Sequence, residues 1–153
     1  MQLPDEAATL AFAADFAHAL LARASAERTP PWLDCSVALV GGLGAGKTTF
    51  VRGVLRALGV VGPIKSPTYA LVESYDTAAG PVHHLDAYRI DGRADFESRG
   101  GFEYFDAPAL RLVEWPEMLN GAIQFDIEVR IDYAGEWRQV TVTPGPKTVW
   151  DAA

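Results

Sequence analysis

Apolar residues in the first part of the chain change their spacing in a way that predicts a helix, a strand and a second helix. Over residues 4–24 they recur every three or four positions, as on one face of an amphipathic helix. The positions of this predicted face are Leu10, Ala14, Ala17 and Leu21, broadened by Phe12 and Phe16. Residues 34–40 indicate a buried strand, and Phe50, Val54 and Leu58 then recur at helical spacing up to Gly59, a residue typical of helix ends.

In the second part of the chain, short apolar runs separated by turn residues predict strands. Residues 70–75 and 82–88 are expected to pair as a hairpin around a turn at 76–81. A short helix is expected near residues 95–99. Three further strands are predicted, at residues 110–115, 125–133 and 137–143. Few helices among many strands favour one α/β domain over residues 1–153, with a mixed parallel and antiparallel sheet and a loosely held tail at 144–153.

Composition narrows the class of protein. The 153 residues carry a net charge of −7 and only 13 Lys and Arg, without a basic cluster, so tight and sequence-independent nucleic-acid binding is not expected. The single cysteine, Cys35, excludes an intrachain disulfide and is interpreted as an inert core residue. No apolar run approaches the ~20 residues that span a membrane. We therefore expect a cytoplasmic protein without membrane association.

A glycine-rich stretch between the first strand and the second helix carries the clearest chemical signal. Residues 41–48 match G-x-x-x-x-G-K-[ST], the Walker A pattern, in its strand–loop–helix context. Glycines allow successive N–H groups to point inward as an anion nest, and the helix N-terminus adds positive potential. Lys47 would reach the β- and γ-phosphates of a nucleotide, and the Thr48 hydroxyl would bind Mg²⁺. The alternative is an ordinary glycine-rich turn.

A nucleoside triphosphatase also needs an acidic residue at the end of an apolar strand. Asp86 and Glu114 both occupy such positions, and the residues alone do not rank them. The alternative for each is a carboxylate that pairs with a neighbour such as Arg89. In the loop at residues 66–69, Thr68 is a candidate to sense the γ-phosphate or to orient water, against the alternative of a simple proline turn.

Aromatic side chains near these candidates have weaker signals. His83 and His84 are adjacent in a predicted strand, so they point to opposite faces and do not suit a two-histidine metal site. One is expected to pack inside and the other to face the surface. Trp115, before Pro116, is expected to cover a nucleotide, to contact a partner, or simply to pack.

Four segments taken together resemble the TsaE family, formerly YjeE, of small bacterial ATPases in tRNA threonylcarbamoyladenosine biosynthesis. They are residues 43–53, 65–69, 84–89 and 113–117. The resemblance implies a P-loop NTPase-like three-layer α/β fold, ATP or ADP and Mg²⁺ as cofactors, and ATP hydrolysis that is slow without partners. It also implies TsaB and TsaD as the partners, with tRNA held through them.

The resemblance carries roles to particular positions. Residues of the phosphate-binding segment are Gly44, Ala45, Gly46, Lys47, Thr48 and Thr49. Thr48 and Glu114 match magnesium-associated positions, and Asp86 matches an acidic position important for hydrolysis. Thr9 resembles a threonine near the adenine, and Arg138 is similar to an arginine near the nucleotide. Gly42 departs from the family pattern, which usually has Asp there.

Two other functions remain open from the sequence. The first is a scaffold that binds ATP without hydrolysing it and uses the nucleotide to stabilise a partner interface. The second is a small-molecule kinase, in which Arg89, Arg93 and Arg99 would form a lid over the phosphates. No acceptor-binding motif supports the kinase.

Overall fold

Seven strands form one mixed sheet within residues 1–27, 33–67 and 69–145, which the computed structural model describes. Their order across the sheet is β1-β7-β6-β2-β5-β4-β3. The strands are β1 (Gln2–Leu3), β2 (Cys35–Val40), β3 (Val72–Thr77), β4 (Gly80–Asp86), β5 (Leu110–Glu114), β6 (Ile127–Ala134) and β7 (Trp137–Pro144). The helices are α1 (Glu6–Glu27), α2 (Lys47–Ala57) and α3 (Gly92–Ser98), with 3₁₀ turns η1 (Gly101–Phe105) and η2 (Pro116–Leu119).

The centre of the sheet is parallel and its flanks are antiparallel. β2 runs parallel to β5 and β6, and β4 runs parallel to β5, whereas β1, β7 and β3 pair in the antiparallel sense. The register places Leu39 beside Glu114 and Glu114 beside Asp86. The carboxyl ends of β2, β5 and β4 therefore meet at one edge, where ligand sites of open α/β sheets gather.

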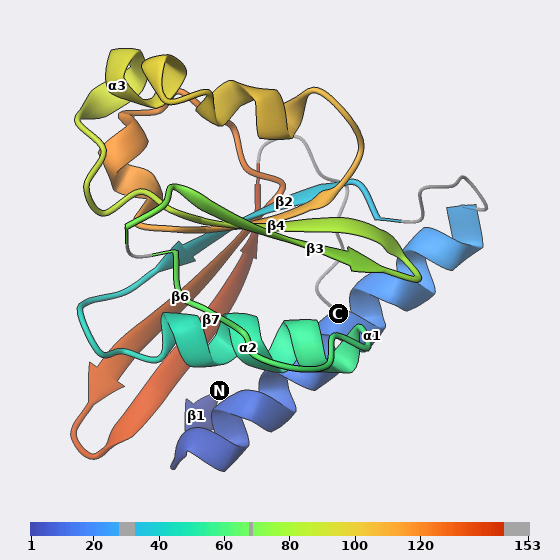
Figure 1. Cartoon of the computed structure of the whole chain (residues 1–153). Helices are drawn as coiled ribbons and strands as arrows, with labels where there is room; N and C mark the ends of the chain where they lie inside the picture. Colours follow the sequence, from blue (N-terminus) through green and yellow to red (C-terminus); the bar gives the residue numbers. More distant parts are fainter. Residues whose placement is uncertain (28–32, 68, 146–153) are drawn as a thin grey trace.

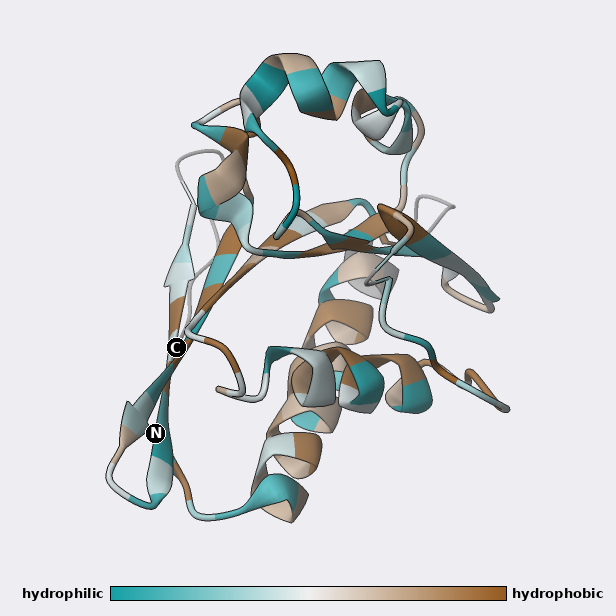
Figure 2. Ribbon diagram, turned by 60° about the vertical axis from the view of Figure 1, so that its left-hand side comes forward, coloured by the Kyte–Doolittle hydropathy of each residue, from teal (hydrophilic) through white to brown (hydrophobic). Residues whose placement is uncertain are grey.

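Helices cover both faces of the sheet, which confirms the three-layer arrangement (Figure 1). On one face, α1 and α2 bury an apolar cluster that includes Phe50, Leu39 and Val129. On the other face, α3, η1 and η2 cover a second cluster that includes Phe96 and Val113. Hydrophobic colouring is concentrated along the central strands, as expected when both faces are covered (Figure 2).

Several element boundaries differ from those expected. The hairpin turns at Thr77–Gly80, not over residues 76–81, because Thr77 and Gly80 pair across it. β1 was not expected at all; it is two residues long, too short for an apolar pattern. The tail expected at residues 144–153 lies outside the described residues from 146 onward.

The buried face of α1 also differs from the predicted one. Its buried residues are Thr9, Ala13, Phe16, Ala17, Leu20 and Ala24. Leu10, Ala14 and Leu21 are only partly buried, so the face is rotated by about one residue from the prediction. On this rotated face, Ala13 packs against Gly53 of α2, and the Phe50 ring of α2 lies 5.3 Å from the Phe16 ring.

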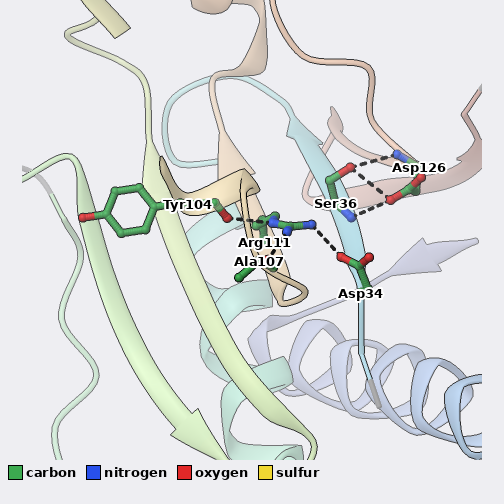
Figure 3. Close-up of polar contacts among 6 residues, drawn as sticks. All are labelled: Asp34, Ser36, Tyr104, Ala107, Arg111 and Asp126. Carbon is green, nitrogen blue, oxygen red and sulfur yellow. Dashed lines mark hydrogen bonds and ion pairs between the residues drawn. The ribbon is translucent and has the colours of Figure 1, made fainter. Parts of the chain in front are cut away.

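At the edge of the sheet where β2 and β5 begin, a buried arginine connects the neighbouring segments by hydrogen bonds. Arg111, at the start of β5, donates hydrogen bonds to the carbonyls of Tyr104 and Ala107 and pairs with Asp34 at 2.9 Å (Figure 3). Beside it, Asp126 accepts from the Ser36 N–H at 2.8 Å. A cavity of about 690 Å³ opens there, and four of its polar lining residues, Asp34, Ser36, Arg111 and Asp126, make the hydrogen bonds just described or further ones within the fold. Among the described residues, no helix is both long and apolar enough to cross a membrane.

Candidate nucleotide-binding site

The loop between β2 and α2 has the backbone that its glycines predict. Gly44 and Gly46 have φ of 71° and 112°, in the left-handed region that favours glycine. A Cβ at Gly41 would collide with the backbone oxygen of Ile131, so β6 packs directly against the loop. Gly46 then caps α2, and the first helical residue is Lys47. The free N–H groups of this first turn are those that bind phosphate in such loops.

The Lys47 side chain is buried and lies across the mouth of the loop. Its ammonium donates hydrogen bonds to the carbonyls of Gly41 and Gly42 and lies 3.8 Å from the centre of the Trp115 ring. Burial lowers the pKa of Lys47, and the charge of Glu114 opposes that shift. Trp115 reaches this position because its backbone is left-handed, with φ of 57°. The cation–π contact identifies one role of Trp115 in this structure: it covers Lys47.

Thr48 and Glu114, the predicted magnesium positions, are in direct contact. The Thr48 hydroxyl donates to the two Glu114 carboxylate oxygens at 3.0 and 3.2 Å. Behind the carboxylate, His84 Nε2 lies 2.6 Å from Glu114 Oε2, and both side chains are almost fully buried. Hydroxyl and carboxylate oxygens are the hard donors that Mg²⁺ prefers, so this group fits the metal that the loop pattern implies.

Asp86 ends β4 beside Glu114 and faces the same cavity. Its carboxylate accepts a hydrogen bond from the Tyr88 N–H at 3.0 Å. Burial raises the pKa of Asp86, and the nearby charge of Glu114 raises it further against the hydrogen bond from Tyr88. Arg89, the neighbour considered as an alternative partner, lies instead 5.5 Å from the centre of the Tyr69 ring.

Two adjoining cavities share the loop residues Gly44, Ala45, Gly46 and Thr49. One, of about 370 Å³, is also lined by Lys47, Thr48, Asp86 and Glu114. The other, of about 210 Å³, is lined by Thr9 from α1 and Arg138 from β7. The first therefore suits phosphates and a metal, and the second suits the rest of a nucleotide.

A tyrosine from the last hairpin holds the tip of the loop. The Tyr133 hydroxyl donates to the Leu43 carbonyl at 2.7 Å, and Arg138 lies 4.2 Å from the centre of the Tyr133 ring. A Cβ at Gly44 would lie 2.9 Å from the Tyr133 hydroxyl. Gly44 is thus required for its backbone conformation and also for this close approach.

The structure brings almost all the predicted site residues to one edge of the sheet. Thr68 lies outside the described residues. His84 and Tyr133 were missed as site residues. His84 could have been found from its position two residues before Asp86, which puts both on one face of β4; Tyr133 has no comparable signal. At Gly42, a Cβ would meet nothing within 4 Å, so a side chain such as the usual Asp has room to begin there.

Comparisons with known proteins agree with this architecture. The family model described as "Threonylcarbamoyl adenosine biosynthesis protein TsaE" matches residues 3–140. The chain is 38% identical over 139 residues to "tRNA threonylcarbamoyladenosine biosynthesis protein TsaE" of Haemophilus influenzae, covering 90% of this chain and 84% of that one. The protein of the same name from Bacillus subtilis is 36% identical over 107 residues, covering 69% of this chain and 66% of that one.

Among solved structures, the crystal structure of Bacillus subtilis YdiB is similar in fold. It aligns with a TM-score of 0.70 at 26% identity, over 94% of this chain and 83% of that chain. The similarity therefore extends over nearly the whole α/β domain.

Proposed function

Because the chain belongs to the TsaE family of threonylcarbamoyl adenosine biosynthesis proteins, we propose that it is an ATPase of the tRNA threonylcarbamoyladenosine machinery. ATP would bind with Mg²⁺ in the two adjoining cavities, with its phosphates on the glycine-rich loop and its base towards Thr9 and Arg138. TsaB and TsaD would be its partners.

One observation carries the proposal: four groups of triphosphatase chemistry line a single cavity. Lys47, Thr48, Asp86 and Glu114 come from α2, β4 and β5, and the sheet register brings them together. Any one of these residues has an ordinary structural explanation. Their convergence beside an anion-binding loop favours phosphate chemistry.

Each residue has a defined task in this proposal. The ammonium of Lys47 would release its hydrogen bonds to the loop carbonyls and bind the β- and γ-phosphates instead. Its charge would neutralise negative charge on the phosphates. Mg²⁺, when bound, would be held by Thr48 and Glu114 and would supply further charge neutralisation. Asp86, partly buried with a raised pKa, would accept a hydrogen bond from the attacking water and orient it. Thr68 is proposed to sense the γ-phosphate.

The net charge of −7 supports a division of labour with the partners. A protein with 13 basic residues and no basic cluster in its sequence would gain little from phosphate contacts with tRNA. We therefore propose that TsaB and TsaD hold the tRNA and that this chain meets it only through them.

ATP turnover measured with and without TsaB–TsaD tests the proposal, with Lys47→Ala as the control. Turnover that depends on Lys47 and rises with the partners is the expected result. No Lys47-dependent turnover under either condition would refute the proposal. The scaffold alternative instead predicts ATP-dependent complex formation that persists in Glu114→Ala and Asp86→Ala without any turnover.

The kinase alternative receives little support from its proposed lid arginines. Arg99 pairs with Asp95 at 2.9 Å, and Arg93 lies 5.0 Å from the centre of the Phe102 ring. Only Arg89 of the three lines the phosphate cavity. The geometry therefore favours hydrolysis over transfer to a bound acceptor.

A further inference from the structure

His84 lies directly behind the Glu114 carboxylate, in the interior of the molecule. Its side chain has no exposed surface, and its Nε2 is 2.6 Å from Glu114 Oε2. A polar ring in such a place costs folding free energy unless its hydrogen bonds are made. The position of His84 therefore calls for a reason beyond filling space.

The sheet register explains how His84 and Glu114 meet. His84 pairs with Leu112 and Asp86 pairs with Glu114, so all four side chains project from the same face of the sheet. That face is the one covered by α2, whose first turn carries Thr48. His83 points to the other face, where its Nδ1 lies 2.8 Å from the Ser74 hydroxyl.

The polar capacity of His84 is directed at Glu114 alone. A carboxylate only accepts hydrogen bonds, so the proton of this contact is on Nε2. Nδ1 is buried and has no hydrogen-bond partner within the described part of the chain. Since the Thr48 hydroxyl donates to the same carboxylate, Glu114 is held from two sides.

We propose that His84 is a positioning residue for the metal site: its Nε2–H fixes the rotation of the Glu114 carboxylate so that the remaining lone pairs face Thr48 and the cavity. This inference rests on the proposed function, in which Glu114 and Thr48 hold Mg²⁺. Groups that orient metal-binding carboxylates commonly change metal affinity by roughly 10- to 100-fold when replaced.

The test compares two polar substitutions that place a donor differently. The amide nitrogen of Gln reaches the position of His Nε2, whereas that of Asn reaches only the position of Nδ1. His84→Gln should keep Mn²⁺ affinity within about 3-fold of the wild type, and His84→Asn should weaken it at least ~10-fold. Mn²⁺ binding in the presence of ADP is measured by electron paramagnetic resonance, which needs no turnover.

Two controls separate positioning from a general structural effect. His83→Gln changes the neighbouring histidine on the opposite face and should leave Mn²⁺ affinity unchanged. ADP affinity without metal should be the same in all variants, and melting temperatures report on folding. A loss of metal-free ADP affinity in His84→Asn equal to its loss of Mn²⁺ affinity would overturn the positioning role.

Three further outcomes would also overturn the positioning role of His84. Equal Mn²⁺ affinity in His84→Asn and the wild type would overturn the inference while leaving the proposed function intact. Equal weakening in His84→Gln and His84→Asn would overturn it too, because the position of the donor would then not matter. A wild-type chain that binds ADP but no Mn²⁺ would contradict the metal site itself, and the inference with it.

Discussion

The Tyr133 hydroxyl joins the glycine-rich loop to a strand that lies 90 residues further along the chain. Its hydrogen bond to the Leu43 carbonyl holds the loop where Gly44 gives room for it. Loss of one such bond costs about 0.5–1.5 kcal/mol. We expect Tyr133→Phe to weaken ADP binding by roughly 2- to 10-fold, measured by calorimetry. Tyr75→Phe, on the edge strand β3, should leave binding unchanged; equal affinity in Tyr133→Phe would show that the loop holds its shape unaided.

The role proposed for Asp86 would come at a cost to stability. Its folded-state pKa lies above the ordinary value, chiefly because of burial. Stability gained from its protonated form is present at low pH and is lost as pH rises through the folded-state pKa. Asp86→Asn should therefore raise the melting temperature of the nucleotide-free protein at about pH 7.5, by an amount that shrinks as pH falls towards about 4. A lower melting temperature at both pH values would contradict this interpretation.

The same substitution should remove ATP turnover. The amide oxygen that Asp86→Asn introduces can still accept from the Tyr88 N–H, so the local backbone has no reason to change. A variant that is more stable and inactive would separate the two effects of the carboxylate.

The Cys35 thiol is not reactive near neutral pH. Burial raises the pKa of its thiol to about 12, with the charges of Asp126 and Asp34 adding to the shift. The thiolate is the reactive form, so the residue is inert near neutral pH, as its position in the first predicted strand indicates.

At the scale of elements, the packing of α1 on α2 depends on Gly53. A Cβ there would lie 2.6 Å from the Ala13 Cβ and 3.1 Å from the Leu10 carbonyl oxygen. Ala is favoured over Gly in helices by about 1 kcal/mol, but overpacking a tight interface costs about 1–3 kcal/mol. With the helix-propensity gain subtracted, we expect Gly53→Ala to lower the free energy of unfolding by up to about 2 kcal/mol in urea titrations.

Gly42→Ala adds the same methyl group in the loop before α2 and serves as the control for this substitution. A Cβ at Gly42 would meet nothing within 4 Å, so its effect on stability should stay within about 0.5 kcal/mol. A stabilising effect of Gly53→Ala would contradict this prediction. It would mean that α1 and α2 can move apart to accept the methyl group without a loss of stability, so that the contact at Gly53 does not limit their packing.

Elements with a regular spacing of apolar residues were predictable, whereas features that depend on neighbouring elements of the fold were not. Both strands that end in site carboxylates, and α2 with its glycine-rich loop, follow from local pattern. The face of α1 does not, because its many alanines fit several rotations, and the packing of Ala13 against Gly53 of α2 selects one. The contacts of His84 and Tyr133 depend on strand register, which a single sequence does not determine.

At the scale of the molecule, the net charge predicts that the isolated chain binds tRNA weakly. With a net charge of −7, the isolated chain should show no tRNA binding below about 10 μM in filter assays at about 0.15 M salt. The TsaB–TsaD assembly, measured in the same assay, serves as the positive control. Tight, salt-sensitive binding by this chain alone would contradict the proposed division of labour.

The proposed nucleotide would contact both the first helix and the last strand, because one of its cavities is lined by α1, the glycine-rich loop and β7. A ligand that binds only the folded state stabilises it by about 2.7 kcal/mol at about 100 times its dissociation constant. For a domain of this size, that corresponds to a rise in melting temperature of roughly 5–10 °C. We expect this rise with ADP and Mg²⁺ in scanning calorimetry, and no rise with Lys47→Ala.

Glu114→Gln separates the metal from the nucleotide in the same measurement. The amide keeps an oxygen and the size of the side chain, but it loses the charge that favours Mg²⁺. This variant should keep the stabilisation by ADP alone and lose the further increment that Mg²⁺ adds in the wild type. An undiminished increment would place the metal away from Glu114, and a loss of both would mean that the carboxylate holds the loop itself.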